Sequence, residues 1–268
     1  MTIAIIGTGN MGGAIMRGLV QSGTCRPEKL ICTAKSEATR NKIREYNVSI
    51  HVSGDNASSV AEADIIILAV KPWLVANVME EIRPSLDLGR QILVSVAAGI
   101  TLNQLVEMAS SSSDRDGASR AVIFRAIPNT AVEVLCGVTV MAHHGASDAQ
   151  VSQIHNLFSA LGYVMVVEEK LIPAATSITS CGIAFAMRYI RAAMEGGVEL
   201  GFRPDEAARL VEHTVKGAAT LLLQNGAHPE AEIDKVTTAG GITIKGLNAM
   251  EHSGFTSAVI DGLKASHL

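Results

Sequence analysis

Three glycines near the start of the sequence have the spacing of a phosphate-binding turn. Gly7, Gly9 and Gly12 form the pattern G-x-G-x-x-G, directly after an apolar run and before a stretch with helical spacing. In such a turn the first glycine allows a tight bend, the second lets the backbone approach a pyrophosphate, and the third lets the helix pack closely. The helix N-terminus then presents free amides to the phosphates. The pattern predicts a dinucleotide site.

The residues after the second apolar run indicate which dinucleotide binds. An NAD site usually has Asp or Glu about 20 residues after the glycines to hold the ribose 2′-hydroxyl, whereas an NADP site carries a cation for the 2′-phosphate. Here the run ends in Ala34-Lys35-Ser36, and the first acidic residue is Glu37. Lys35, with the Ser36 hydroxyl beside it, favours a 2′-phosphate. We therefore expect NADPH, with NADH as the alternative.

A second pair of glycines lies near the C-terminal end, with a hydroxyl group on each side. Thr238, Gly240, Gly241 and Thr243 precede a helix-forming run over residues 245–252. Free amides and the positive end of a helix suit an anion, and glycine lets a small carboxylate approach closely. The equally weighted alternative is a plain turn in which Thr243 only caps the helix.

Other residues that often do chemistry lack a suitable pattern. His143 and His144 are adjacent without the spacing of a zinc site, so surface histidines and no metal are expected. The four cysteines show no CxxC spacing, which is typical of reduced core thiols in a cytosolic protein. Cys181 has no nearby histidine, so we expect a buried structural thiol there.

Alternating strand-like and helix-like stretches must position these residues. Seven apolar runs before residue 168 predict βαβ units and a mostly parallel sheet, and only helix-forming stretches follow. We predict an α/β fold with an N-terminal Rossmann-type doubly wound domain over residues 1–167 and an all-helical C-terminal domain over residues 168–268. Expected strands are residues 2–6, 30–33, 65–70, 92–96, 121–127, 137–141 and 163–167, and expected helices include residues 12–22, 75–82, 149–161, 173–200, 205–224, 243–252 and 256–263.

One helix of the second domain is too apolar to be buried by that domain alone. Residues 178–200 are apolar or small over most of the helix circumference, and Arg188, Arg191, Glu195 and Glu199 form a single charged stripe. Such a helix must be covered on most sides. We therefore expect a homodimer in which a second copy covers it.

The overall composition excludes several classes of protein. The 268 residues carry a formal net charge of −4 without a clustered basic face, so no nucleic-acid partner is expected. The longest apolar runs are at most about half of a bilayer span, so no membrane segment is expected. No basic segment precedes the first apolar run, which predicts a cytoplasmic location without a secretory signal. Because 24 glycines accompany only 5 Phe, 3 Tyr and 1 Trp, ligands are expected to rest on amides and hydroxyls.

Several segments together resemble the pyrroline-5-carboxylate reductase family over essentially the whole chain. The later segments are the more diagnostic, because many β-hydroxyacid dehydrogenases resemble the earlier ones. The segments are residues 7–13, Ala69-Val70-Lys71-Pro72, residues 94–99, Ile127-Pro128-Asn129-Thr130 followed by Gly137-Val138-Thr139, and Thr238-Ala239-Gly240-Gly241-Ile242-Thr243.

The resemblance implies an NADP-binding Rossmann domain and a helical domain that interlocks with a second protomer, with rings of dimers also compatible. It implies hydride transfer from NADPH or NADH to the imine carbon of 1-pyrroline-5-carboxylate, giving L-proline in the final step of proline biosynthesis. The implied substrate contacts are Glu169, Thr238, Gly240, Gly241, Ile242 and Thr243. The implied dinucleotide contacts are Ile6, Gly7, Thr8, Gly9, Asn10, Met11, Ala34, Lys35, Ser36, Asn56, Ala69, Val70, Lys71, Ala97, Ala98 and Gly99.

Thr243 is the residue that we expect to be catalytic. A protonated cyclic imine is already electrophilic at carbon, so the protein has mainly to align it and exclude water. The position of Thr243 after the glycines favours contact of its hydroxyl with the ring nitrogen, where it orients the substrate or relays a proton.

The sequence departs from the family pattern in two segments. Residues 179–185 read Thr-Ser-Cys-Gly-Ile-Ala-Phe where the family has Ser-Gly-Ser-Gly-Pro-Ala-Tyr, so Ile183 and Phe185 replace a proline and a tyrosine. Ala239 stands where the family has a proline before its two glycines. The alternatives are a non-catalytic NADP-binding regulatory protein of the same fold and a reductase of another cyclic imine carboxylate.

A 3-hydroxyacid dehydrogenase is disfavoured. Those enzymes use a lysine on a helix after the Rossmann domain. Lys170 falls in the predicted linker and Lys216 lies in the middle of a predicted helix, so neither is a convincing counterpart.

Overall fold

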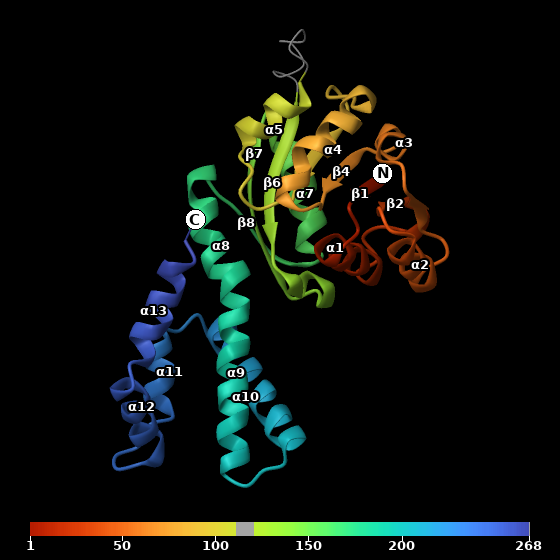
Figure 1. The fold of residues 1–268 in the computed structure, drawn as a ribbon. Coiled ribbons are helices and arrows are strands. Elements are labelled where there is room, and N and C mark those ends of the chain that lie inside the picture. The colour runs from red at the N-terminus through yellow and green to blue at the C-terminus, as the bar shows by residue number, and fades with distance from the viewer. Residues whose placement is uncertain (111–120, 268) are drawn as a thin grey trace. The chain divides into compact units, whose positions relative to one another are not determined.

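The computed structural model of the chain describes residues 1–110 and 121–267 (Figure 1). The chain divides into two compact units, Met1–Ser180 and Cys181–His267. Every strand of the described residues belongs to the first unit, and the elements of the second are all helices. The predicted α/β class, with a Rossmann-type sheet followed by a helical part, is confirmed.

One eight-stranded sheet organises the described part of the first unit, in the order β3-β2-β1-β4-β5-β6-β7-β8. Neighbouring strands are parallel except for the antiparallel pair β6 and β7. The order changes direction at β1, and open α/β sheets bind ligands at such a switch point. The strands are β1 (Ile3–Ile6), β2 (Leu30–Thr33), β3 (His51–Ser53), β4 (Ile65–Leu68), β5 (Ile92–Ser95), β6 (Val122–Pro128), β7 (Gly137–His144) and β8 (Gly162–Val166).

All strands but β3 lie where apolar runs predict them. His51, Val52 and Ser53 form β3 at the edge of the sheet, and their side chains are exposed or half-buried. An edge strand that buries little has no apolar run, so hydrophobic periodicity does not reveal it. Strand β7 is longer than predicted because its end pairs with β6, where Ile123 lies opposite His144.

The core lies on both faces of the sheet, because side chains alternate along each strand. On β1, Ile3 and Ile5 join one buried cluster, whereas Ala4 and Ile6 join the other. Helices cover both faces, as expected for strands that are apolar throughout (Figure 1). The helices of this unit are α1 (Asn10–Gln21), α2 (Glu37–Tyr46), α3 (Asn56–Ala61), α4 (Val75–Ile82), α5 (Leu102–Ala109), α7 (Asp148–Ser159) and α8 (Ile172–Thr176).

The first compact unit extends beyond residue 167, where the sequence analysis ends the first domain. Helix α8 continues it, and the side chain of Ile172 is fully buried in one of the two core clusters. Ser177, just after α8, is also buried. This packing places the beginning of the helical stretch in the first unit. The functional division at residues 167 and 168 stays a prediction.

The second unit consists of five helices among its described residues, and four of them overlap the predicted ranges. Gly226 follows α10 with a positive φ of 61°, a conformation that glycine adopts readily at the end of a helix. Helix α11 was not predicted, because it is short and polar. The helices are α9 (Gly182–Glu199), α10 (Pro204–Asn225), α11 (Pro229–Lys235), α12 (Ile242–His252) and α13 (Phe255–Ala265).

The second unit has almost no core of its own. Between residues 181 and 267 the only buried residue is Ala207, on α10. Large apolar side chains such as Met187, Leu210 and Ile260 are about half exposed, at 58%, 52% and 49%. The prediction that helix 178–200 needs covering agrees with this exposure.

A helical stretch runs without a break from Glu169 to Glu199. Within the part of the chain that the structure describes, it is long and apolar enough to cross a membrane by length and composition alone, and it is 11% buried over its most apolar window. It contains a π-helical turn at Ser177–Cys181. The expectation of no membrane segment rests on the lengths of shorter apolar runs, so it stays a prediction.

Candidate functional site

The glycine turn after β1 leaves no room for side chains at two of its glycines. Gly7 has a φ of 89°, and a Cβ there would lie 2.5 Å from Cγ1 of Val70. A Cβ on Gly12 would lie 2.6 Å from the carbonyl oxygen of Gly7. Both glycines are therefore needed for the turn itself, because Gly7 adopts a left-handed backbone conformation and Gly12 packs against the carbonyl oxygen of Gly7.

Gly9 differs from these two glycines, because its open side faces no protein atom. A Cβ on Gly9 would have no heavy atom within 4 Å. Gly9 is the N-cap of α1, and no side chain caps this helix. The amides of Asn10 and Met11, which open the helix, therefore have no intrahelical acceptor. An open cradle of glycine and free amides fits the pyrophosphate of a dinucleotide.

The other predicted cofactor residues lie after the carboxyl ends of neighbouring strands. Because the order β3-β2-β1-β4-β5 is continuous and parallel, these ends meet along one edge of the sheet. Asn56 opens α3 after β3, but its side-chain amide donates a hydrogen bond to Oε2 of Glu81 at 3.0 Å. The structure brings together at this edge Ile6 to Met11 after β1, Ala34 to Ser36 after β2, Asn56 after β3, Ala69 to Lys71 after β4 and Ala97 to Gly99 after β5.

The turn after β2 is exposed and carries charge. The side chain of Ser36 is the N-cap of α2, where its Oγ accepts a hydrogen bond from the amide of Thr39 at 3.2 Å. Lys35 is exposed beside it. Glu37 follows as the first helical residue, and both of its oxygens accept hydrogen bonds from arginines, Arg40 and Arg44. Neither arginine is among the residues predicted to bind the cofactor.

Glu169 holds together two parts of the first unit. Its Oε1 accepts hydrogen bonds from the amide of Leu102 at 2.7 Å and from Nη1 of Arg125 at 3.0 Å. Arg125, on β6, is only 7% exposed, and its Nε has no hydrogen-bond partner. Leu102 is the first residue of α5, three positions after the predicted cofactor residue Gly99. The carboxylate is thus engaged within this unit at the end of the β5 turn.

The glycine turn in the second unit is well defined. The amide of Gly241 donates to the carbonyl of Thr238 at 2.9 Å, and Gly240 has a φ of 72°, which is the geometry of a type II turn. A Cβ on Gly241 would lie 2.6 Å from Oγ1 of Thr238. Gly241 is the N-cap of α12, which begins at Ile242. Both glycines are therefore required by the backbone.

Thr243 is the second residue of α12 and is exposed. No side chain caps this helix. The alternative interpretation predicted a plain glycine turn with Thr243 as the helix cap. The turn is present, but the capping role of Thr243 is wrong. The first amides of α12 and the Thr243 hydroxyl remain available to a small anion.

The chain was next compared with known proteins. Residues 169–268 match the family described as pyrroline-5-carboxylate reductase dimerisation, and residues 2–99 match NADP oxidoreductase coenzyme F420-dependent. Pyrroline-5-carboxylate reductase of Arabidopsis thaliana is 33% identical over 265 residues, 98% of this chain and 92% of that protein. The chain belongs to the pyrroline-5-carboxylate reductase family.

Two further relatives complete the comparison. Pyrroline-5-carboxylate reductase 1 of Dictyostelium discoideum is 37% identical over 98% of this chain, which spans about half of that relative's length, 48%. The Plasmodium falciparum pyrroline carboxylate reductase structure, which has NADP bound, has a TM-score of 0.87 at 24% identity and covers 99% of this chain and 95% of its own. That likeness shows that the two chains share the fold.

The segment that departs from the family pattern lies at the π-helical turn. The side-chain amide of Asn129 donates to the carbonyl of Thr179 at 3.3 Å, which gives this irregular backbone a partner. Ser180 Oγ is buried there without a hydrogen-bond partner. Ile183 lies on α9 just after the turn, and Phe185 is 37% exposed. The family tyrosine is thus replaced by a ring that has no hydroxyl.

The cysteines are free, but they are not all core thiols. Cys25 and Cys32 are buried, and burial raises the pKa of the Cys32 thiol to about 12. Cys136 is exposed and Cys181 is half-buried, so the predictions of core thiols throughout and of a buried Cys181 are wrong. Cys136 follows the 3-10 turn after Asn129, where the chain passes over the surface.

Among residues 1–110 and 121–267, no group of three or more His, Cys, Asp or Glu side chains is placed to hold a metal ion. His143 is exposed, and its ring lies 5.6 Å from that of Phe124, the residue opposite it on β6. His144 is half-buried.

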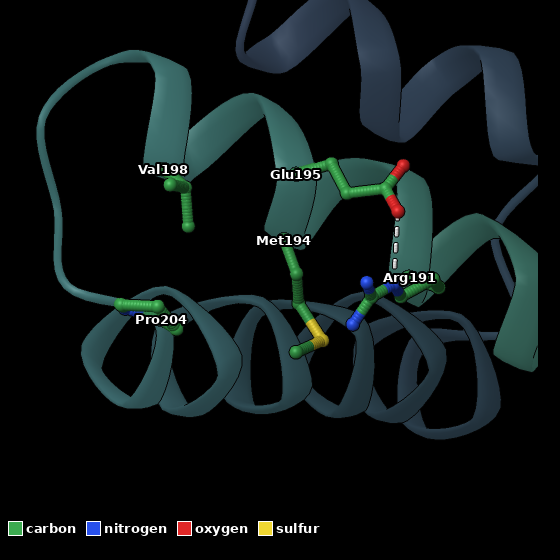
Figure 2. A pocket seen from close by; sticks show the side chains of 5 residues that line it. All are labelled: Arg191, Met194, Glu195, Val198 and Pro204. Carbon is green, nitrogen blue, oxygen red and sulfur yellow. Dashed lines mark hydrogen bonds and ion pairs between the residues drawn. The ribbon is translucent and has the colours of Figure 1, made fainter.

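A hollow of about 280 Å³ lies in the second unit, and Figure 2 shows its lining. Arg191 and Glu195 on α9 form an ion pair at 2.9 Å, so the charged groups of the hollow satisfy each other. No residue predicted to bind substrate or cofactor lines it. The lining residues are Arg191, Met194, Glu195, Val198 and Pro204.

Proposed function

We propose that this chain is an NADPH-dependent reductase of 1-pyrroline-5-carboxylate that forms L-proline, the final step of proline biosynthesis. The observation that carries the proposal is the pair of glycine cradles, each at the opening of an uncapped helix. One, at Gly9 before α1, fits a pyrophosphate, and the other, at Gly241 before α12, fits a small carboxylate. Both occur in a chain of this family.

The first unit holds the cofactor in this proposal. The pyrophosphate rests on the amides that follow Gly9, and the adenosine ribose lies by Ala34, Lys35 and Ser36, where a cation suits a 2′-phosphate. Residues 97–99, after β5, border the nicotinamide. When bound, NADPH supplies the hydride that adds to the imine carbon. The NADP bound to the Plasmodium falciparum relative supports this choice of cofactor.

The second unit holds the substrate carboxylate in this proposal. The amides of residues 242 and 243 point to the ligand from the helix N-terminus, and Gly240 and Gly241 allow it to approach closely. The hydroxyl of Thr243 then hydrogen-bonds the ring nitrogen. A protonated imine nitrogen needs no further acid, because the hydride completes the C–H bond and the nitrogen keeps its proton as the amine.

Glu169 has a structural role in this proposal besides the substrate contact that the resemblance implies. Because its Oε1 is engaged by Leu102 and Arg125, its role in this proposal is to fix the start of α5, next to Gly99. Its side chain is 30% exposed, so the carboxyl group is not closed off from a ligand by the first unit.

We also propose that the working form is a homodimer, from which rings of dimers can be built. The exposed apolar side chains of residues 181–267, and the match of the same region to the dimerisation family, support this. Light scattering at micromolar concentration should give at least twice the mass of one chain. A monodisperse monomer would contradict the proposal. The proposed location is the cytoplasm, which suits four free cysteines.

One assay tests the proposed reaction. NADPH oxidation is followed by absorbance with 1-pyrroline-5-carboxylate, with its six-membered homologue and with a 3-oxoacid. Turnover that is fastest with the five-membered imine, and proline recovered in equal amount to the NADPH consumed, supports the proposal. Faster turnover of the six-membered ring assigns the chain to another cyclic imine carboxylate.

A regulatory protein without turnover is the second candidate function. The altered residues Ile183, Phe185 and Ala239 favour it. Ala239 is the second residue of the turn that ends at Gly241, where proline would set the backbone angle in advance. Binding of NADPH without its oxidation on any of the three substrates would identify this function.

A further inference from the structure

Arg40 has the most unusual side chain at the edge of the sheet where the predicted cofactor residues lie. It extends from the first turn of α2 back to the loop that follows β2, and it is only 19% exposed. Its Nη1 donates to the carbonyl oxygens of Ala34 at 2.7 Å and of Lys35 at 3.0 Å. The guanidinium also fills the space beside Gly54, where a Cβ would lie 3.0 Å from Nη1. A single side chain thus fixes two consecutive peptide groups of the loop.

The same guanidinium also engages the nearest acidic residue. Oε2 of Glu37 accepts hydrogen bonds from Nε of Arg40 at 2.8 Å and from its Nη2, and Oε1 accepts one from Nη1 of Arg44 at 2.7 Å. The hydrogen bonds from Arg44 and Arg40 hold the pKa of the Glu37 carboxyl below its ordinary value. The carboxylate that could otherwise repel a phosphate is therefore occupied on both oxygens.

The charges around the loop favour an anion. Lys35, Arg40 and Arg44 carry three positive charges against the one carboxylate of Glu37. The hydroxyl of Ser36 is already used as the cap of α2 and shares a hydrogen bond with Oγ1 of Thr39 at 2.8 Å. The Lys35 ammonium has no ion pair in the described residues, so it is free to contact a ligand.

We infer that Arg40 is the positioning residue that makes this site select NADPH over NADH. It fixes the peptide groups of residues 34 and 35 so that the Lys35 ammonium faces the ribose 2′-phosphate, while it keeps Glu37 from acting as the 2′-hydroxyl acceptor of an NAD site. This inference rests on the proposed cofactor site. It adds a residue that lies outside the Gly-rich turn and that acts through its neighbours.

The test uses the full chain with Arg40→Met and with a matched control, Arg44→Met. Both arginines lie on α2 and both pair with Glu37, but only Arg40 contacts the loop carbonyls. The first readout is calorimetric binding of adenosine 2′,5′-bisphosphate and of 5′-AMP, which differ in the 2′-phosphate alone. The second is kcat/KM for NADPH and for NADH with the imine substrate.

Arg40→Met should lower the affinity for adenosine 2′,5′-bisphosphate by about tenfold or more, as the loss of charge-assisted hydrogen bonds predicts. The affinity for 5′-AMP should change by less than about twofold. The ratio of kcat/KM for NADPH to that for NADH should fall by a similar factor. Arg44→Met removes the same charge without the contacts to the loop carbonyls, so it should reduce both readouts clearly less than Arg40→Met does. Arg40→Lys keeps the charge but loses the two-carbonyl contact, so it should recover only part of the selectivity.

If Arg40→Met lost affinity for both nucleotides equally, Arg40 would only maintain the loop, and the inference would be wrong. It would also be wrong if Arg44→Met lost as much selectivity as Arg40→Met, because net charge alone would then explain the effect. Equal binding of the bisphosphate and 5′-AMP by the unaltered chain would overturn it directly. Selective bisphosphate binding without imine turnover would refute the proposed function and leave this inference intact.

Discussion

A methyl group added at two glycines of the same turn should have opposite consequences. Gly9→Ala places its methyl in open space, where no protein atom lies within 4 Å. Gly12→Ala places the same methyl 2.6 Å from the carbonyl oxygen of Gly7 and 3.1 Å from Cβ of Ala69. The first change should therefore affect the ligand alone, and the second should affect the fold.

The expected magnitudes follow from these contacts. A relaxed C···O contact is about 3.3–3.6 Å, so Gly12→Ala must move the backbone by about 0.7 Å or more. Overpacking of this kind costs about 1–3 kcal/mol, and the higher helix propensity of alanine offsets about 1 kcal/mol of it, so the net destabilisation is about 0–2 kcal/mol. For a protein of this size that lowers the Tm by up to about 8 °C. Gly9→Ala meets no protein atom and loses only the preference for glycine over alanine at an N-cap, so it should change the free energy of unfolding by less than about 1 kcal/mol.

Two measurements separate the variants. Thermal unfolding is followed without nucleotide, and NADPH binding is followed by the fluorescence of the nicotinamide. Gly9→Ala should lower the Tm by less than about 4 °C. It should lose at least about tenfold in NADPH affinity, because the methyl occupies the place of the pyrophosphate. Unchanged NADPH affinity in Gly9→Ala would refute the assignment of this cradle to the pyrophosphate. A Tm of Gly9→Ala below that of Gly12→Ala would refute the reasoning from contacts.

Three further predictions concern other parts of the chain. Glu169→Ala should lower the free energy of unfolding, measured in urea, by about 2–3 kcal/mol, because it leaves the Arg125 guanidinium buried without a partner. Arg125→Met should cost less, and in the double variant it should reduce the effect of Glu169→Ala. Additive losses in the double variant would contradict the pairing. Thr243→Ala should lower kcat by at least about tenfold with little change in NADPH affinity, whereas Thr243→Ser should retain most of the kcat of the unaltered chain. An unchanged kcat and KM in Thr243→Ala would contradict the proposed role. In the native protein a thiol reagent should label Cys136 within minutes and spare Cys32, whose burial raises its pKa to about 12, as peptide mass spectrometry can check; early labelling of Cys32 would contradict the buried environment.

The parts of the fold that sequence periodicity predicts are those that bury apolar side chains. Strand β1 and the Gly7 turn were predicted because an apolar run and a glycine pattern are both local in sequence. Strand β3 was missed because its residues lie at an edge and bury little. Helix α2 was missed for a similar reason, since Ile43 is its only buried residue.

Side-chain roles were harder to predict, because they depend on contacts between distant residues. Arg125 and Glu169 are 44 positions apart, and nothing in the sequence near either residue indicates the pair. Arg40 lies close to Lys35 in sequence, but periodicity does not say that its side chain turns back onto the loop. The position of this arginine one turn after a capping serine is the signal that could have found it. The alternative role of Thr243 as a cap could be decided only by the backbone, which begins the helix at Ile242.

The near absence of a core in the second unit has a consequence for how the protein responds to its own abundance. Ala207, its only buried residue, gives little burial to oppose the entropy of ordering residues 181–267. In the proposed homodimer the missing burial comes from association, so stability follows the law of mass action. Dilution should lower the melting temperature of the helical unit, and a cell that makes little of this chain keeps less of it folded.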